Sequence, residues 1–381
     1  MRCTFVLPGV HAVNRGAEVA FESVATELAR LGSDDVTVIG SGPPIPGRPY
    51  EYLRLGLIRR ERFERAPKGP IFRSDSIYEE ATFAASLVAK RRLRETDITV
   101  TCSYPFLNWA LTYLPIRGRR PPHVFVTQNG DWPAYARERE YRFFRCDGLV
   151  CTNPDYYERN RLHWNCTLVP NGIDSASMHP GPVARADFGL PEDVPLVLMV
   201  SALIESKRVL EGMRAVARLP DAHLVVAGDG EMRSQVQALA DQIMPGRFRC
   251  VTVPSERMGE LYRSADVVLH TSLYESFGNV YVEALASGAP VVAHDYSVTR
   301  WIFGDHPGLV DTCDEDAVVR ALSHALRHGK EHATMLAPGA AERFSWAAVA
   351  RQYRSFLEEV VGRAHPSSAH GSEAGGRLLP P

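Results

Sequence analysis

Short runs of apolar residues alternate with longer amphipathic stretches along almost the whole chain. This pattern is typical of parallel sheets with crossover helices, because strands that are buried on both faces appear as continuous apolar runs. We therefore predict an α/β protein. In the first half, the pattern predicts strands near residues 3–8, 36–40, 98–102, 123–127, 148–151 and 166–169.

The alternation is interrupted by a segment that contains several Pro and Gly residues, MHPGPVARADFGLPEDVP, and then starts again. We interpret this segment as a linker between two doubly wound domains, residues 1–175 and residues 176–340. Ligands of such sheets bind outside the carboxyl ends of the strands, so the cleft between the domains is the expected site. In the second half, the pattern predicts strands near residues 195–201, 222–227, 248–253, 266–270 and 290–293.

The C-terminal part of the chain has a different pattern. The stretch FSWAAVARQYRSFLEEVVGR has apolar residues at helical spacing and predicts a separate last helix, residues 341–362. The closing stretch HPSSAHGSEAGGRLLPP is polar and rich in Gly and Pro. It predicts a disordered tail, residues 363–381.

Composition supports a folded protein of two domains. The chain has 381 residues, of which 45% are hydrophobic and 23% are charged, and these values argue against disorder, collagen and coiled coil. The net charge of −2 and the absence of a nucleic-acid-binding signature predict that nucleic acid is not a partner. The seven cysteines are scattered without C-x-x-C spacing, which argues against a disulfide framework and a zinc site.

The beginning of the sequence, MRCTFVLPG, lacks the features of a signal peptide. No apolar run approaches the roughly 18 residues of a membrane-spanning helix. We therefore expect a cytoplasmic protein.

One segment, residues 54–94, has an unusual charge balance, with eleven Lys or Arg against five Asp or Glu. It has two interpretations. The segment consists of solvated helix faces and a long loop, or it forms a basic surface that docks on anionic lipid or on an anionic acceptor. The second interpretation predicts peripheral contact with the inner face of a membrane.

The stretch LYESFGNVYVEALASGAPVVA, residues 273–293, places two glutamates around a glycine. Gly278 lies at the start of a predicted helix, where free N–H groups favour a phosphate and glycine allows close approach. Glu283 lies about 7–8 Å deeper along that helix, roughly the distance from a pyrophosphate to its ribose. Glu275 precedes the helix and would face the other end of such a ligand. The alternative is that Glu275 is a surface glutamate in a loop and Glu283 an unrelated glutamate in a helix.

Several ordered blocks together resemble the retaining GT-B glycosyltransferases of family 4, which use nucleotide-sugars. The resemblance extends from Gly9 to about Arg354 and implies two Rossmann-like domains that face a central cleft, with a last helix that crosses back onto the first domain. The blocks are NRGAEVAFESVATELARLG, VPNGID at 169–174, VSALIESKRVLEGMRA, VVAGDGE at 225–231 and ELYRSADVVLHTSLYESFGNVYVEALASGAPVVA.

The resemblance also implies how the second domain binds the donor. Glu283 would bind the ribose, and Glu275 would hold hydroxyls of the sugar and support positive charge at its anomeric carbon. Lys207 would neutralise charge on the departing diphosphate. The remaining donor-binding residues are Ser276 in the turn, the backbone amides of Phe277, Gly278 and Asn279, Gly16 from the first domain, and Gly228, which provides packing room.

The sequence departs from the family pattern at two positions. Ala202 stands where members often have an arginine that shares the diphosphate, and Arg208 is a candidate replacement. Asn129 stands where many members have a histidine that touches the donor sugar. An amide can form hydrogen bonds but cannot accept a proton at ordinary pH. Nearby, Asp131 is the candidate base on the acceptor side, or alternatively a loop cap.

The expected reaction is transfer of a sugar to a hydroxyl of a saccharide, lipid-linked or small-molecule acceptor by front-face substitution. A nucleotide-sugar epimerase or hydrolase of the same fold is an alternative, and Ala202 and Asn129 also leave a non-catalytic binding protein open. A nicotinamide-dependent oxidoreductase is disfavoured because no G-x-G-x-x-G opens either domain.

Neither a metal nor another cofactor is expected. The acidic run from Asp314 to Asp316 precedes a helix and is better explained as its N-terminal cap, and the histidines form no H-E-x-x-H cluster. The Asn-Gly turn at Asn171, Gly172 and Asp174 is expected to be structural, at the hinge.

Acceptor contacts are expected from aromatic residues of the first domain, although most such residues simply belong to a core. The candidates are Tyr104, Phe106, Trp109, Trp132 and Tyr135.

Overall fold

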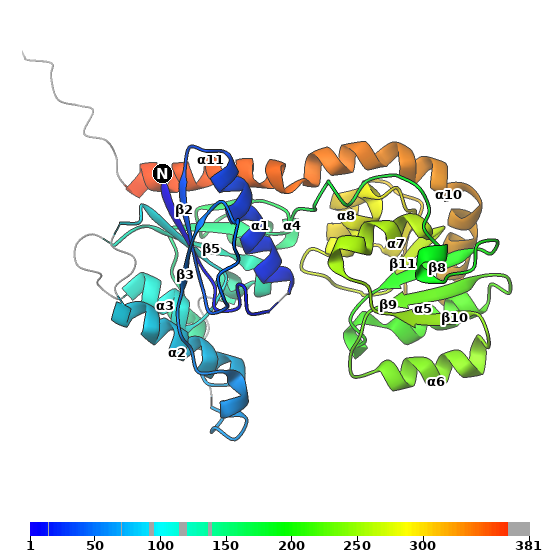
Figure 1. The fold of residues 1–381 in the computed structure, drawn as a ribbon, viewed down its shortest axis with the longest axis horizontal. Helices are drawn as coiled ribbons and strands as arrows, with labels where there is room; N and C mark the ends of the chain where they lie inside the picture. Colours follow the sequence, from blue (N-terminus) through cyan, green and yellow to red (C-terminus); the bar gives the residue numbers. More distant parts are fainter. Residues whose placement is uncertain (14, 70, 91–94, 114–119, 136–138, 365–381) are drawn as a thin grey trace, which may run out of the picture.

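The computed structural model describes residues 1–13, 15–69, 71–90, 95–113, 120–135 and 139–364. It contains two α/β domains, each built on its own parallel sheet, with two long helices running along one side of both (Figure 1). The predicted α/β class with two sheets is confirmed. The predicted tail falls almost entirely on residues 365–381, which lie outside the described residues.

The first domain has a seven-stranded sheet in the order β3-β2-β1-β4-β5-β6-β7, and every neighbouring pair is parallel. The six predicted strands are confirmed to within two residues at their ends, and β3 at the edge was not predicted. The strands are β1 (Arg2–Val6), β2 (Asp35–Gly40), β3 (Glu51–Arg54), β4 (Ile98–Thr101), β5 (His123–Val126), β6 (Gly148–Cys151) and β7 (Cys166–Leu168).

Helices cover the first sheet because each has one apolar face. In α1, for example, Phe21, Val24 and Leu28 follow the helical repeat and are buried against the sheet. The helices are α1 (Gly16–Arg30), α2 (Asp75–Lys90), α3 (Phe106–Tyr113) and α4 (Pro154–Asn160), with short 3-10 turns η1 (Arg60–Phe63), η2 (Thr127–Asn129), η3 (Trp132–Tyr135) and η4 (Arg139–Phe143).

The second domain has a six-stranded parallel sheet in the order β10-β9-β8-β11-β12-β13. The five predicted strands are again confirmed to within two residues, and the two-residue strand β13 was not predicted. The strands are β8 (Leu196–Val200), β9 (His223–Ala227), β10 (Phe248–Val251), β11 (Val267–His270), β12 (Val291–His294) and β13 (Leu309–Val310).

Five helices and three short turns of the second domain precede its long C-terminal helix among the described residues. They leave the sheet buried on both faces, as the continuous apolar strands require. They are η5 (Ala186–Phe188), η6 (Glu205–Lys207), α5 (Val209–Ala217), α6 (Arg233–Ile243), η7 (Ser255–Arg257), α7 (Met258–Ser264), α8 (Asn279–Ala286) and α9 (Ser297–Phe303).

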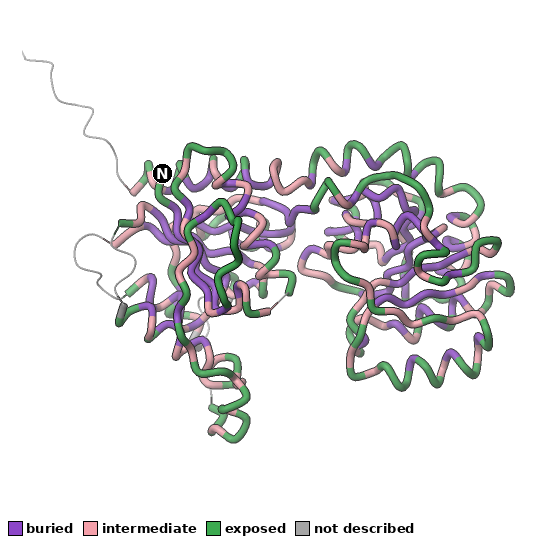
Figure 2. Tube along the Cα trace, in the orientation of Figure 1, coloured by how far each residue is buried: buried purple, intermediate pink, exposed green. Residues whose placement is uncertain are grey.

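The buried residues gather around each sheet separately, so the protein has two main centres of packing (Figure 2). The predicted domain boundary near residue 175 falls in the stretch between β7 and β8. The boundary itself stays a prediction.

The C-terminal part forms two long helices, α10 (Glu315–Phe344) and α11 (Trp346–Ala364), which meet at Ser345. The predicted last helix therefore begins a few residues later than expected. At the other end of α10, an Asp314 side-chain oxygen accepts a hydrogen bond from the backbone N–H of Ala317 at 3.1 Å. Asp314 is thus the N-terminal cap of the helix, as the sequence predicted.

Helix α11 packs against the first domain, although α10 belongs to the second (Figure 1). Its apolar residues Val349, Tyr353, Phe356, Leu357 and Val360 join the core of the first domain together with α1. The expected return of the last helix to the first domain is confirmed. In the part of the chain that the structure describes, no helix is both long and apolar enough to cross a membrane.

Candidate active site

A cleft of about 1200 Å³ lies between the domains. The first domain contributes Gly16, Gln128, Asn129 and Asn171, and the second contributes residues 275–279. These residues come from loops at the carboxyl ends of strands or from the starts of helices. The cleft is therefore at the place that the two doubly wound sheets predict.

Glu275 is the centre of a charged cluster on the second domain. One of its carboxylate oxygens accepts from Lys207 Nζ at 2.5 Å and lies 2.8 Å from His270 Nε2. Burial opposes its ionisation, but the contacts with His270 and Lys207 outweigh burial and lower the pKa of Glu275 to about 2. Glu275 is thus a carboxylate at any physiological pH.

Gly278 forms the turn that starts α8. Its φ of 80° is left-handed, and a Cβ there would lie 2.4 Å from the Tyr281 ring. Only glycine fits this position without strain. Among the described residues no side chain caps the first turn of α8, so the backbone N–H groups at its very start, before that of Tyr281, are available to an anion in the cleft.

Glu283 lies in α8, deeper along the helix than Gly278. It is half-buried, and its carboxylate accepts from the Tyr262 hydroxyl at 2.7 Å. Burial raises the pKa of Glu283 above its ordinary value. Tyr262 therefore fixes one carboxylate oxygen and leaves the other for a second partner.

Polar side chains of the first domain hold the 275–279 turn. Asn153 donates to the backbone carbonyl of Ser276, and the Tyr156 hydroxyl donates to the Ser276 hydroxyl at 3.3 Å. Asn171 donates to the side-chain oxygen of Asn279 at 3.1 Å. These bonds connect the two domains directly at the turn.

The first domain leaves room opposite this turn. Apart from its chain neighbours and the backbone of its own helix, no atom of the described residues lies within 4 Å of the position that a Cβ on Gly16 would take, so the space in front of α1 is open. Asn129 lines the cleft and donates to the Cys102 sulfur at 3.6 Å, while Gln128 bonds to Asn171. The cleft thus has polar walls on both sides.

Two family models match the chain, one for each domain. Residues 14–177 match Glycosyltransferase Family 4, and residues 182–343 match Glycosyl transferases group 1. Together the two models cover nearly all of both domains. The chain belongs to this glycosyltransferase family.

Curated proteins that are similar in sequence to this chain are also glycosyltransferases. The chain is 30% identical over 201 residues to the lipopolysaccharide core biosynthesis glycosyltransferase LpsE of Rhizobium meliloti, an alignment that covers 52% of this chain and 58% of LpsE. The chain thus spans little more than half of that relative's length.

Solved structures share the fold over almost the whole chain. Sucrose-phosphate synthase from Thermosynechococcus elongatus has a TM-score of 0.77 at 20% identity, over 95% of this chain and 99% of that one. Anabaena Alr3699/HepE in complex with UDP-glucose has a TM-score of 0.71 at 16% identity, over 94% and 100%. The fold of this family 4 glycosyltransferase is GT-B, as the sequence predicted.

Four residues predicted for the donor site are not among those that line the cleft, namely Lys207, Arg208, Gly228 and Glu283. Lys207 contacts the lining residue Glu275. Arg208 donates to the Cys313 sulfur at 3.4 Å and lies 3.9 Å from Glu211. Gly228 packs on Ser201, whose carbonyl oxygen would lie 1.8 Å from an added Cβ. The structure therefore gives Gly228 a packing contact and leaves Arg208 without a contact in the cleft.

Asp131 also lies outside the lining of the cleft. Its side chain is 4% exposed and accepts from Arg159 Nε and Asn160 Nδ2, both at 2.7 Å. Burial raises the pKa of Asp131 in spite of these donors. Asp131 is positioned to hold α4 against the loop after β5, which corresponds to the alternative of a structural cap.

The aromatic residues that the sequence suggested for acceptor contacts fall into two groups in this family 4 glycosyltransferase. Tyr104 and Trp132 line the cleft, with their rings 6.5 Å apart and nearly parallel. Phe106 and Trp109 instead pack on each other at 5.5 Å, away from the lining. The side chain of Tyr135 lies outside the described part of the chain.

Sequence reasoning missed several groups that face the cleft or support it. His270 ends strand β11 just before the glutamate turn, and this position at a carboxyl end was the available signal. Glu18 and Glu80 line the first-domain wall, and no sequence pattern distinguishes them from surface glutamates. Within the described ranges, no group of three or more His, Cys, Asp or Glu side chains is arranged to hold a metal ion.

Proposed function

We propose that this protein is a retaining glycosyltransferase that moves a sugar from a nucleotide diphosphate-sugar to a hydroxyl of a saccharide, lipid-linked or small-molecule acceptor. The observation that carries the proposal is the Lys207–Glu275–His270 cluster next to the open N-terminus of α8. A cation, a fixed carboxylate and free N–H groups are the groups that a diphosphate and a sugar require.

In the proposed complex, the N–H groups of Phe277, Gly278 and Asn279 bind the diphosphate, and Glu283 accepts the ribose hydroxyls. Lys207 stabilises the charge that grows on the leaving diphosphate. Glu275, ionised because of its low pKa, holds hydroxyls of the sugar and stabilises positive charge at the anomeric carbon. Gly16 and Asn129 close the site from the first domain.

The proposed reaction is a front-face substitution. The bond from the anomeric carbon to the diphosphate oxygen breaks, and the acceptor oxygen forms its bond on the same face. The acceptor proton passes to the leaving diphosphate, so no separate protein base is required. This assignment agrees with the position of Asp131, which is tied to Arg159 and Asn160.

Nucleotide release tests the proposal. The protein is incubated with UDP-, GDP-, dTDP- and ADP-sugars, with and without extracts of lipid and saccharide acceptors. The UDP-sugars come first because the HepE structure is described as a complex with UDP-glucose. Release that depends on an acceptor supports transfer, whereas conversion of the donor alone supports an epimerase or hydrolase.

Glu283→Ala provides the second part of the test. We expect weaker donor binding because the ribose loses its carboxylate. No release from any donor, combined with unchanged donor binding by the variant, would contradict the proposed function. Binding without turnover against every acceptor would instead favour a non-catalytic nucleotide-sugar-binding protein.

The proposed location is the cytoplasm, with peripheral contact at the inner membrane face through residues 54–94. The seven free cysteines accord with a reducing compartment. The basic residues of the segment would supply the attraction to anionic lipid.

A further inference from the structure

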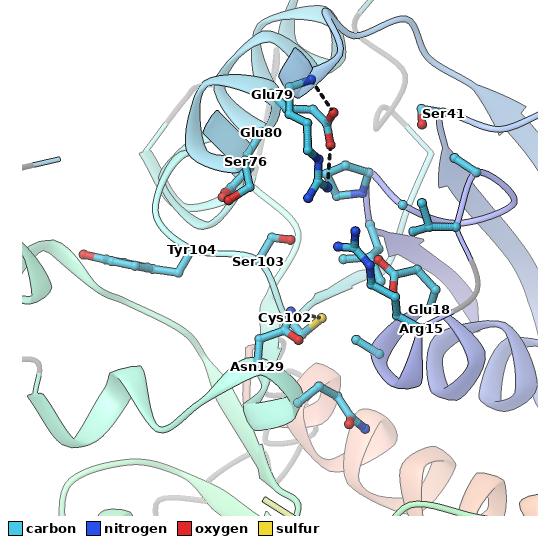
Figure 3. Close-up of a pocket in the computed structure, with 18 of the residues that line it drawn as sticks. Arg15, Glu18, Ser41, Ser76, Glu79, Glu80, Cys102, Ser103, Tyr104 and Asn129 are labelled. Carbon is cyan, nitrogen blue, oxygen red and sulfur yellow. Dashed lines mark hydrogen bonds and ion pairs between the residues drawn. The ribbon is translucent and has the colours of Figure 1, made fainter. Parts of the chain in front are cut away.

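Arginines gather on the first-domain part of the cleft. Five of them line it, from the start of α1, the end of β3, η1 and the approach to α2. Figure 3 shows Arg15 beside Glu18 on one side of the cavity, with Glu79 and Glu80 of α2 on another. The five are Arg15, Arg54, Arg59, Arg60 and Arg73.

Two of the five arginines have partners within the protein. Arg60 Nη2 lies 3.2 Å from Glu79 Oε1, and its backbone N–H donates to the same carboxylate at 2.9 Å. Arg73 donates to the Tyr141 hydroxyl at 3.1 Å and lies over that ring. These contacts fix the walls of the cavity and satisfy both side chains.

The other three arginines form no ion pair with any of the described residues, although many arginines elsewhere in the molecule do. Arg54 Nε donates to the backbone carbonyl of Ser41 at 3.0 Å, which orients the guanidinium, and its terminal N–H groups form no ion pair within the described part of the chain. Arg15 and Arg59 are exposed to the cleft. Unpaired arginines in a concave site favour an anionic ligand.

Carboxylates in the same region offset this charge only in part, because four of them line the first-domain wall against five arginines. Glu80 is buried, and one of its oxygens accepts from the backbone N–H of Leu107 at 2.9 Å, at the start of α3. Burial raises the pKa of Glu80 to about 7 and also raises that of Glu18. Glu61 is the remaining exposed carboxylate on this wall among the described residues.

Polar and aromatic groups lie beside the arginines. Ser41, Ser76 and Ser103 line the same wall, and Tyr104 and Trp132 present nearly parallel rings. Hydroxyls and aromatic faces suit a sugar or another polyol ring. The wall therefore combines hydroxyl and aromatic groups that suit a sugar ring with guanidinium groups that suit an anion.

We propose that the first-domain wall binds an acceptor that has a phosphate group, and that Arg15, Arg54 and Arg59 hold this phosphate. Guanidinium groups bind phosphate oxygens through paired N–H donors, which explains three unpaired arginines in one wall. That this ligand is the acceptor rests on the proposed function. The phosphate belongs either to a free phosphorylated polyol or to a lipid headgroup.

Matched pairs of compounds test the proposal by isothermal titration with UDP present. The pairs are glucose and glucose 6-phosphate, mannose and mannose 6-phosphate, and inositol and inositol phosphate. Vesicles of phosphatidylcholine with and without phosphatidylglycerol test the lipid source by co-sedimentation. We expect at least one phosphorylated member to bind about tenfold more tightly than its neutral match, and more weakly as salt increases.

The variant Arg54→Gln/Arg59→Gln should remove that preference. Arg62→Gln/Arg65→Gln is the matched control, because it removes the same charge from the same segment at positions that do not line the cleft. The control should keep the preference. If only the vesicle preference depends on Arg54 and Arg59, the phosphate is a lipid headgroup.

Two results would overturn the proposal. One is that no phosphorylated compound or anionic vesicle is preferred over its neutral match, and the other is that both double variants weaken the preference equally. Failure of the proposed function is a different result. It would appear as absent nucleotide release while the arginine-dependent preference for phosphate persists.

Discussion

At the scale of single residues, the ionisation of Glu275 follows from its neighbours. Its side chain is only 13% exposed, a condition that alone would raise its pKa. Lys207 and His270 reverse this effect and lower the pKa to about 2 from an ordinary 4.5. The charge on Glu275 therefore depends on contacts made by residues that are distant in the sequence.

The low pKa of Glu275 predicts a pH dependence of stability. A depressed pKa stabilises the folded state above pH 4.5, and this contribution is lost as the pH falls toward 2. Glu275→Gln should lack this contribution, on the order of 1–3 kcal/mol. Urea unfolding of both proteins from pH 7 down to pH 3 measures the difference. Parallel curves over the whole range would contradict the assignment.

For Glu80 we predict the opposite change of stability with pH. Its folded pKa of about 7 lies above the ordinary 4.5, so the unfolded chain loses the proton first as the pH rises. Stability should therefore fall between pH 4.5 and pH 7, by at most about 1.4 kcal/mol per pH unit. Glu80→Gln should flatten the curve in this window. An unchanged slope in the unfolding free energy of the variant would show that Glu80 is already ionised.

The candidate site was predictable where its chemistry is local in the sequence. Glu275, Gly278 and Glu283 lie in one turn and one helix, and the structure brings the first two to the cleft. Arg208 was chosen because it follows Lys207, but a left-handed backbone at φ 52° turns it toward Cys313. Sequence offset alone does not show this change of direction.

At the scale of helices and strands, periodicity predicted most of the fold. Strands that are buried on both faces give clear apolar runs, and their ends were placed within two residues. The two missed strands are short edge strands, β3 and β13, in which one side has no neighbour to bury it. Their pairing depends on the rest of the sheet, so their own residues contain little signal.

Helix α11 depends on a close approach to strand β6. A Cβ on Gly148 would lie 2.6 Å from Val360 and 3.1 Å from Phe356. Gly148→Ala should therefore push α11 away and destabilise the first domain by about 1–3 kcal/mol. Urea unfolding followed by tryptophan fluorescence measures the loss. Gly56→Ala is the control because nothing lies within 4 Å of its added methyl group, and equal losses would contradict the close approach.

At the scale of the whole molecule, the site exists only where the two domains meet. Asn153, Tyr156 and Asn171 of the first domain bond to the turn that contains Glu275 and Gly278. The Ser297 hydroxyl of α9 also donates to Asp155 of α4. None of these pairs was predictable, because their members are more than 100 residues apart in the sequence.

Because a few hydrogen bonds connect the domains at the site, we predict that substitutions that remove them will let the domains move apart. Asp155→Ala/Asn171→Ala removes two of the bonds, and at about 1 kcal/mol for each bond the equilibrium constant between the arrangement with the domains in contact and one with them apart should fall at least tenfold. We expect a larger radius of gyration in small-angle scattering and a weaker affinity for the donor. Arg161→Ala is the control, since Arg161 pairs with Glu158 on the same helix. A double variant with unchanged scattering and unchanged donor affinity would show that the remaining contacts, which include those of Asn153 and Tyr156 with Ser276, are enough to hold the domains together.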